Sequence, residues 1–222
     1  MPNRVRRYLT GIITLGSLAL IAALAQWHCA DPLRFAAYLL LALLAGTLKV
    51  RLPGMTGTYS LTFLFVLIGI VDLTVAETLV IASLSMVVQS IWRTQGRPRL
   101  IQVIFNAAAV VISAAVSFLA ARSLGFGNSL LLHLIELALA ASVYFAVNTL
   151  LVSGILALES ERPLHKIWSQ WFRWSFPYYR VGVAIAAMVI VSNRYAGWTY
   201  SLLLFPIMYL EYICHRLTVR SS

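Results

Sequence analysis

Charged side chains are scarce in this sequence. Asp, Glu, Lys and Arg make up only 11% of its 222 residues and apolar residues make up 61%, whereas a soluble domain is usually about a quarter charged and about half apolar. This deficit excludes a protein that is surrounded mainly by water. We therefore expect a single integral membrane domain over residues 1–222, with no soluble domain.

Cysteine is also rare, and recognisable catalytic motifs are missing. The two cysteines, Cys29 and Cys214, fall at opposite membrane faces in the topology given below, and neither has the spacing of a metal ligand. The sequence contains no Gly-rich phosphate loop, no HExxH and no GxSxG. We therefore expect a protein that is not an enzyme, with no catalytic residues, no metal site and no cofactor.

What the sequence does contain is long apolar runs. A spanning helix needs roughly 20 apolar residues, and suitable runs lie at 8–27, 33–50, 100–121, 129–151, 177–196 and 198–214. The stretch 60–92 would form one helix of about 50 Å, too long for a hydrocarbon core of about 30 Å. Asp72, followed by Glu77, predicts a helix start in its middle. The fold class is therefore all-α, a polytopic transmembrane helix bundle of about eight spans that includes a short helical hairpin at 60–92.

The basic residues alternate between the two sides of this topology in a strongly unequal way. Arg34, Arg122 and Arg194 fall on one side. The other side holds Arg4, Arg6, Arg7, Lys49, Arg51, Arg93, Arg97, Arg99, Arg162, Lys166, Arg173, Arg180, Arg216 and Arg220. Lys and Arg concentrate in cytoplasmic loops, so we expect a multi-pass protein of the bacterial inner membrane with both termini in the cytoplasm. The partner of this charge is the lipid bilayer and not nucleic acid, because the charge is spread over all the short loops.

The segment 163–174 has a Trp-rich apolar face and a basic polar face. Such a segment is typical of an amphipathic helix that lies in the membrane interface. We expect Trp168, Trp171 and Trp174 to anchor it there as a connecting segment. The alternative is a docking surface for a cytoplasmic or membrane protein partner.

Polar side chains inside the spans are the candidate functional residues. His133, Glu136, Tyr144 and Asn148 lie at helical spacing along 129–151, and Asn106 lies in the preceding span. Intramembrane polar groups need a partner, a water-filled cavity or a function. One hypothesis is that these five residues bind a small-molecule ligand that enters from outside, with Asp72 and Glu77 at the mouth. The other is that they only join neighbouring helices, with His133 as the nearest partner of Glu136.

A series of short motifs resembles a known family. It includes Lys49-Val50-Arg51-Leu52-Pro53-Gly54, the segment 57–65, Val88-Gln89-Ser90-Ile91-Trp92-Arg93 and Gln102-Val103-Ile104-Phe105-Asn106. Together they resemble the N-terminal multi-pass membrane domain that precedes GGDEF (diguanylate cyclase) or HD phosphohydrolase domains in some bacteria. The resemblance implies a membrane sensor. No cyclase or phosphodiesterase follows the last helix here, so we expect a free-standing relative or the membrane part of a longer protein, without catalytic activity.

A weaker likeness leaves other functions open. The short hairpin 60–92 after a Gly/Thr-rich loop is similar to the substrate-capture subunits of energy-coupling-factor vitamin transporters. The leading hypothesis is a non-enzymatic membrane sensor or scaffold. The alternatives are a substrate-binding subunit of a small-molecule uptake transporter and a structural subunit of a larger membrane complex.

Overall fold

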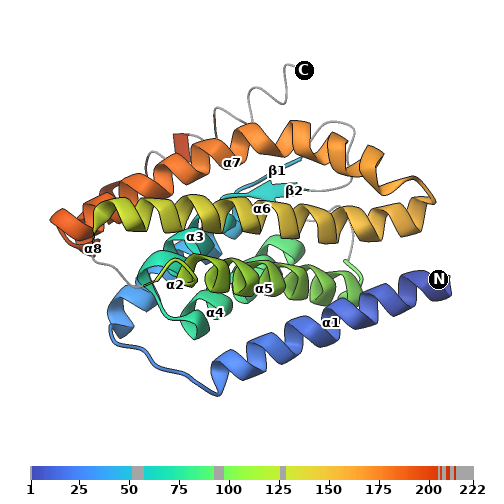
Figure 1. Cartoon of the computed structure of the whole chain (residues 1–222), viewed down its shortest axis with the longest axis horizontal. Coiled ribbons are helices and arrows are strands. Elements are labelled where there is room, and N and C mark those ends of the chain that lie inside the picture. Colours follow the sequence, from blue (N-terminus) through green and yellow to red (C-terminus); the bar gives the residue numbers. More distant parts are fainter. Residues whose placement is uncertain are drawn as a thin grey trace.

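The computed structural model describes residues 2–51, 58–92, 98–125 and 129–204, with scattered positions beyond them. Nearly all of these residues are helical (Figure 1). The helices are α1 (Asn3–Leu24), α2 (Pro32–Thr47), α3 (Thr62–Asp72), α4 (Val75–Ile91), α5 (Leu100–Arg122), α6 (Leu130–Ser160), α7 (Leu164–Tyr195), α8 (Trp198–Ser201) and the short 3₁₀ turn Leu202–Leu204. The helical fold class is confirmed. The structure adds a small antiparallel ribbon of β1 (Lys49–Arg51) and β2 (Thr58–Ser60), in which Val50 is opposite Tyr59.

Within the described ranges, four helices are long and apolar enough to cross a membrane: α1, α5, α6 and the part of α7 from Ser175 to Tyr195. Their outward sides carry exposed apolar residues such as Leu18, Leu119 and Met188, as expected for surfaces that face lipid. The helices α2, α3 and α4 are apolar but shorter. Most of the predicted span 198–214 lies outside the described residues beyond position 204. The count of about eight spans stays a prediction.

The helices α1 to α7 run alternately between two ends of the bundle (Figure 1). At one end, the Arg34 side chain donates to the carbonyl oxygen of Asp72, and the Thr74 hydroxyl donates to the carbonyl oxygen of His28. At the other end, Lys49 Nζ donates to the carbonyl oxygen of Gln89. We name these the Asp72 end and the Gln89 end. The predicted distribution of basic residues between the two membrane sides depends on this alternation.

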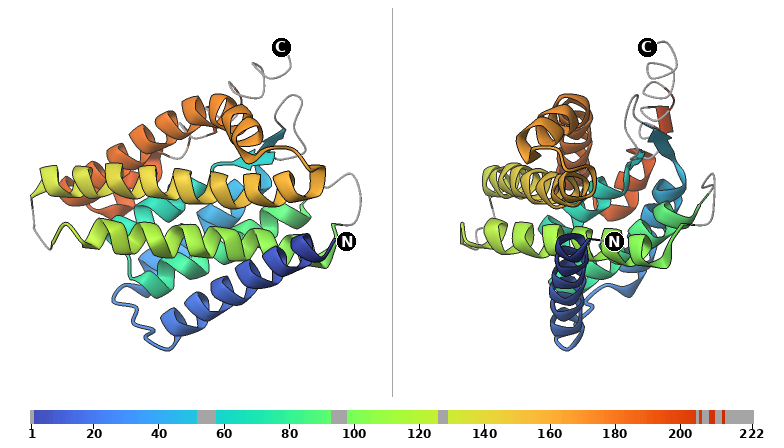
Figure 2. Two further views of the ribbon diagram at one scale, coloured as in Figure 1. Left: turned by 45° about the vertical axis from the view of Figure 1, so that its right-hand side comes forward. Right: turned by 90° about the vertical axis from the view of Figure 1, so that its right-hand side faces the viewer.

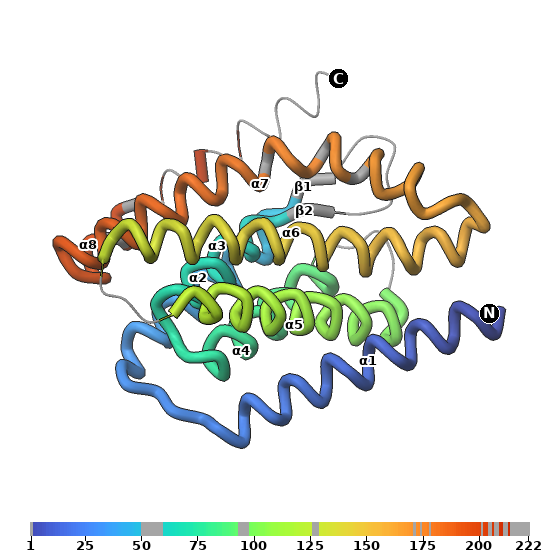
Figure 3. The backbone as a smooth tube through the Cα atoms, viewed as in Figure 1, coloured from blue at the N-terminus to red at the C-terminus, as the bar shows by residue number. Residues whose placement is uncertain are grey.

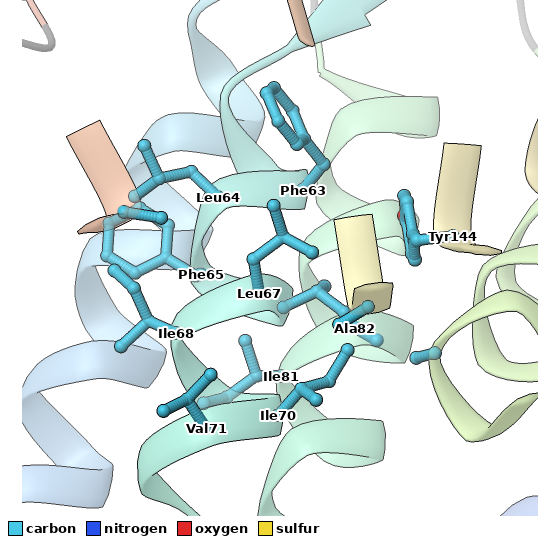
Figure 4. Close-up of a cluster of buried hydrophobic side chains, with 14 of the residues drawn as sticks. Phe63, Leu64, Phe65, Leu67, Ile68, Ile70, Val71, Ile81, Ala82 and Tyr144 are labelled. Atoms are coloured by element: carbon cyan, nitrogen blue, oxygen red, sulfur yellow. The ribbon is translucent and has the colours of Figure 1, made fainter. Parts of the chain in front are cut away.

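The short helix α3 lies at the centre of the bundle. Every residue from Thr62 to Val71 is buried, and α3 packs against α2, α4, α5, α6 and α7. Its leucines and isoleucines fill the core shown in Figure 4, together with Ile81 of α4 and Tyr144 of α6. A helix that is apolar on all sides is stable only when other helices surround it. By contrast, α1 lies at the edge, beneath α5 in the left-hand view of Figure 2.

The helical hairpin expected at 60–92 is present as α3 and α4, but its second helix begins two residues later than predicted. Thr74 is the N-cap of α4: its hydroxyl accepts from the Glu77 backbone N–H, and the Glu77 carboxylate accepts from the Thr74 backbone N–H. This reciprocal capping box satisfies two donors that a helix start leaves free. Asp72 is instead the last residue of α3. The break was predicted correctly, and its capping residue was not.

The segments predicted as an interfacial helix at 164–174 and a span starting at 177 are not separate helices, although the part that is apolar enough to cross a membrane does begin at Ser175. The chain turns tightly after α6 and continues through both segments as one 32-residue helix, α7 (Figure 3). Pro177 lies inside it. Proline removes a backbone donor and normally ends or bends a helix, but helices packed in a membrane protein tolerate it because neighbouring groups satisfy the freed carbonyl.

Candidate functional site

A polar cluster from three helices lies at the Asp72 end. The amide Nδ2 of Asn193 on α7 donates to the carboxylate of Asp72 on α3 and to the Tyr38 hydroxyl on α2, at 2.8 Å. The guanidinium of Arg34 on α2 donates from Nη2 to the Asp72 carbonyl oxygen at 3.0 Å. We call Arg34, Tyr38, Asp72 and Asn193 the Asp72 cluster. It joins residues up to 155 positions apart in the sequence.

Two atoms of this cluster are buried without a hydrogen-bond partner among the described residues: the Nε–H donor of Arg34 and the acceptor Oδ1 of Asn193. A buried polar atom without a partner costs about 1–3 kcal/mol. His133 and Arg194 lie close enough to act electrostatically on the Asp72 carboxylate, as Arg34 does. Groups from α2, α6 and α7 therefore converge on one carboxylate of α3.

A second group of polar residues lies beside it, where the loop after α1 meets the start of α4. The Thr74 hydroxyl bonds to the Glu77 carboxylate at 2.8 Å as well as to His28. The Cys29 thiol faces the same carboxylate, and its hydrogen bond to Glu77 is the main reason that the pKa of Cys29 is raised, with burial and the charge of Glu77 adding to it. Glu77 therefore favours the neutral thiol form of Cys29.

The structure places two of the predicted ligand-binding residues, His133 and Glu136, near the N-terminus of α6. The predicted pairing between them is not formed. His133 Nδ1 lies 2.9 Å from the Ser129 carbonyl oxygen. Glu136 is only 4% exposed, and its carboxylate makes no hydrogen bond or ion pair within the part of the chain that the structure describes. The Glu136 oxygens are not among the fully buried atoms that lack a partner, so the carboxylate keeps some access to its surroundings.

Tyr144 and Asn148 lie further along α6, where they meet α7. Asn148 Nδ2 donates to the Tyr179 hydroxyl at 3.4 Å, and the Tyr144 and Tyr179 rings are 6.3 Å apart. Tyr179 also packs on Phe63 in the first turn of α3, with ring centroids 4.4 Å apart. These contacts join α6, α7 and α3, which is the role that the second hypothesis assigned to the polar stripe.

Asn106 lies at the opposite end and does not share a site with His133. Its side chain donates to the Ser90 hydroxyl at 3.3 Å. Next to Ser90, the Gln89 side-chain oxygen accepts from the hydroxyls of Ser60 and Thr62. We call Ser60, Thr62 and Gln89 the Gln89 cluster. Several residues that carried the family resemblance therefore meet here, where they fix the ribbon and α3 to the end of α4.

The predicted interfacial anchors are only partly described. Trp168 Nε1 donates to Thr149 Oγ1 of α6 at 3.1 Å, and Ile167 and Phe172 pack against the main core. The side chains of Trp171 and Trp174 lie outside the described ones. Part of the apolar face of 164–174 therefore packs on α6, and anchoring in lipid headgroups stays a prediction.

Sequence reasoning missed three members of the Asp72 cluster. Tyr38 and Asn193 were not singled out, and Arg34 was considered only as a loop charge. Arg34 and Asn193 are isolated polar residues near helix ends, and Tyr38 is an isolated polar residue about two turns into α2, so no periodic pattern within one helix marks them. The signal that could have found them is the assignment of α2, α3 and α7 to the same end of the bundle, combined with the rule that buried polar groups need partners.

Comparison with known protein families gives one match. The family model MASE9 matches residues 20–218, which is most of the chain. None of the curated proteins compared matches this chain, and none of the solved structures does.

Proposed function

Because the chain belongs to MASE9, a family of membrane-associated sensor domains, we propose that it is a non-enzymatic sensor of the bacterial inner membrane. The family match over residues 20–218 carries this proposal. In our proposal, the Asp72 end receives the signal and the Gln89 end passes it to a cytoplasmic signalling enzyme, either on the same chain or as a partner.

The packing of α3 and α7 supports a connection between the two ends. Asn193 of α7 bonds to Asp72 at the last residue of α3. At the first turn of α3, the Phe63 ring packs so closely on Gly182 of α7 that a Cβ added there would lie 2.1 Å from the ring. Thr62 then bonds to Gln89. A change at Asp72 would thus act on α7 and on α3, which α7 contacts at both ends of α3, and would reach the Gln89 cluster through them.

The distribution of charge supports placing the Gln89 end in the cytoplasm. Helix ends and turns at that end carry Arg4, Arg6, Arg7, Lys49, Arg99, Arg162 and Lys166. The Asp72 end carries Arg34, Arg122 and Arg194. Basic residues near the ends of spans set orientation, so we propose that Cys29 faces outward.

Cysteine labelling in intact spheroplasts tests this orientation. In a Cys214→Ser variant, a membrane-impermeant maleimide should label Cys29 without permeabilisation. The matched control is a Cys29→Ser, Cys214→Ser, Ser160→Cys variant, which should be labelled only after permeabilisation. Labelling of Ser160→Cys in intact spheroplasts would reverse the proposed topology.

Purification from native membranes tests the sensor function. The tagged full-length chain should retain a cyclase, phosphodiesterase or kinase in native mass spectrometry, and a Gln89→Leu variant that still folds should retain less of it. Recovery of an ATPase pair with a coupling membrane protein would support the transport alternative instead. Recovery of the chain only within a large assembly without a signalling enzyme would also contradict the sensor proposal.

A further inference from the structure

We propose that the Asp72 cluster is a binding site for a small zwitterion that carries both an ammonium and a carboxylate group, with glycine as the smallest example. This inference rests on the proposed sensor function for its biological meaning, since the bound molecule would be the signal. The binding itself is argued only from the groups in the cluster.

The cluster presents one unused donor and one unused acceptor. The Arg34 Nε–H and the Asn193 Oδ1 have no partner among the described residues, although both atoms are buried. The only other buried side-chain atom in this condition within the described ranges is the Ser153 hydroxyl. Both side chains are already bonded to Asp72, Arg34 through its Nη2 and Asn193 through its Nδ2. Because both side chains bond to Asp72, the proposed molecule lies beside this residue, where it accepts from the Arg34 Nε–H and donates to the Asn193 Oδ1.

The charges at the same place fit a zwitterion better than a simple anion. A guanidinium is the preferred side chain for binding a carboxylate, because its fixed donors match the geometry of the two oxygens. The Arg34 hydrogen bond goes to the Asp72 backbone carbonyl oxygen and not to its carboxylate, so the Nε–H of Arg34 stays available to a ligand carboxylate. Asp72 and the Asn193 Oδ1 then form an acceptor pair that suits an ammonium group.

The distribution of the acidic residues also favours a zwitterion as the ligand. Four of its seven acids, Asp31, Asp72, Glu77 and Glu136, lie at the Asp72 end, together with Arg34, Arg122, Arg194 and His133. A site of mixed charge does not attract a free anion or a free cation strongly. A molecule with both charges can pair each of them, and the burial of the cluster favours a small one.

Isothermal titration of the full-length protein in lipid nanodiscs tests the proposal. The probes are glycine and L-alanine. The comparison compounds, called half-ligands here, carry only one of the two charges: acetate and N-acetylglycine have only the carboxylate, and methylammonium has only the ammonium. Glycine should bind, and each half-ligand should bind at least about tenfold more weakly, because each leaves one buried charged group unpaired.

Two conservative variants and one control locate the site. Arg34→Lys keeps the charge but loses the Nε–H and the planar fork, and Asp72→Asn keeps the shape but loses the charge. Each should weaken glycine binding by at least about tenfold. Arg122→Lys, at the same end of the bundle but outside the cluster, should leave it unchanged. Circular dichroism and thermal melting establish that each variant is folded.

Three results would overturn the proposal. The first is no heat of binding for glycine or L-alanine in the folded protein, which would leave water as the partner of the two buried atoms. The second is equal binding of acetate and glycine. The third is unchanged glycine binding in both Arg34→Lys and Asp72→Asn. None of these results affects the co-purification of a signalling enzyme, so failure of the ligand and failure of the sensor function are distinguishable.

Discussion

Gly16 of α1 packs directly on Ala108 of α5. A Cβ added to Gly16 would lie 2.7 Å from the Cβ of Ala108 and 2.8 Å from its Cα and carbonyl oxygen. Two of these three atoms belong to the backbone of α5, which cannot move aside as the end of a flexible side chain can. The approach of α1 to α5 therefore depends on the missing side chain at position 16.

Replacing Gly16 by alanine should loosen the docking of α1. We expect Gly16→Ala to destabilise the bundle by about 1–3 kcal/mol, as inserted methyl groups do in well-packed cores. Gly11→Ala is the control on the same helix, because nothing lies within 4 Å of a Cβ at that position. It should be neutral or stabilise by up to about 1 kcal/mol through helix propensity. Unfolding in mixed detergent micelles measures both, and equal effects would contradict the close contact.

Breaking the Gln89 cluster should remove the acceptor that two buried hydroxyls share, and leave them only their bond to each other. Gln89→Leu removes the oxygen that accepts from Ser60 and Thr62, and we expect a loss of about 1–3 kcal/mol. A double-mutant cycle with Ser60→Ala checks the cause, because Ser60→Ala should cost less in the Gln89→Leu background, where only the contacts of Ser60 with Thr62 remain to be lost. Fully additive losses would show that the two side chains do not act together.

Neutralising Glu136 should not weaken the fold. The Glu136 carboxylate bonds to no described residue, so Glu136→Gln removes no hydrogen bond or ion pair among them, and we expect the thermal midpoint to stay unchanged. The thermal midpoint of Glu77→Gln is a useful comparison for the same substitution at a carboxylate that has hydrogen-bond partners, since glutamine also satisfies a capping box. A loss of more than about 1 kcal/mol in Glu136→Gln would instead indicate that the acid joins helices through a contact it needs for stability.

Removing the charge of Glu77 should increase the reactivity of Cys29. The Glu77 carboxylate raises the pKa of the Cys29 thiol, and the thiolate is the form that reacts with maleimides. Glu77→Gln should therefore lower that pKa and move the pH profile of alkylation to lower pH, with faster labelling at any fixed pH below the pKa. Stopped-flow labelling of a Cys214→Ser protein measures this. An unchanged profile would exclude the contact between Cys29 and Glu77.

The sequence was sufficient to predict features that depend on one segment at a time. The excess of apolar residues predicted a helical membrane protein, and the length of 60–92 predicted a break between two short helices. The capping residue was missed because Asp72 and Thr74 are both good N-caps. A tertiary contact distinguishes the two residues: the Asp72 side chain is bonded to Asn193 of α7, while Thr74 caps α4 together with Glu77.

The candidate site was harder to predict because it depends on how deep each residue lies in the bundle. Helical spacing correctly placed Glu136, Tyr144 and Asn148 along α6, but it does not align α6 with α5. Asn106 is near the start of α5, and the antiparallel arrangement of α5 and α6 puts it near the opposite end from Glu136 (Figure 1). Five residues predicted to form one pocket are therefore spread along the bundle.

The position of α3 also has a consequence for biosynthesis. This helix has eleven residues, about 16 Å in length, and no side that faces lipid between Thr62 and Val71. The bilayer alone gives such a segment little stability, because other helices cover the apolar surface of α3 in the folded protein. The helix is also long enough for only about half of the hydrocarbon core. Its final partner, α7, is synthesised more than 90 residues later. A ribosome-bound chain that ends before α7 should therefore hold α3 in an unfinished site, accessible to membrane chaperones and proteases until Gly182 closes over Phe63.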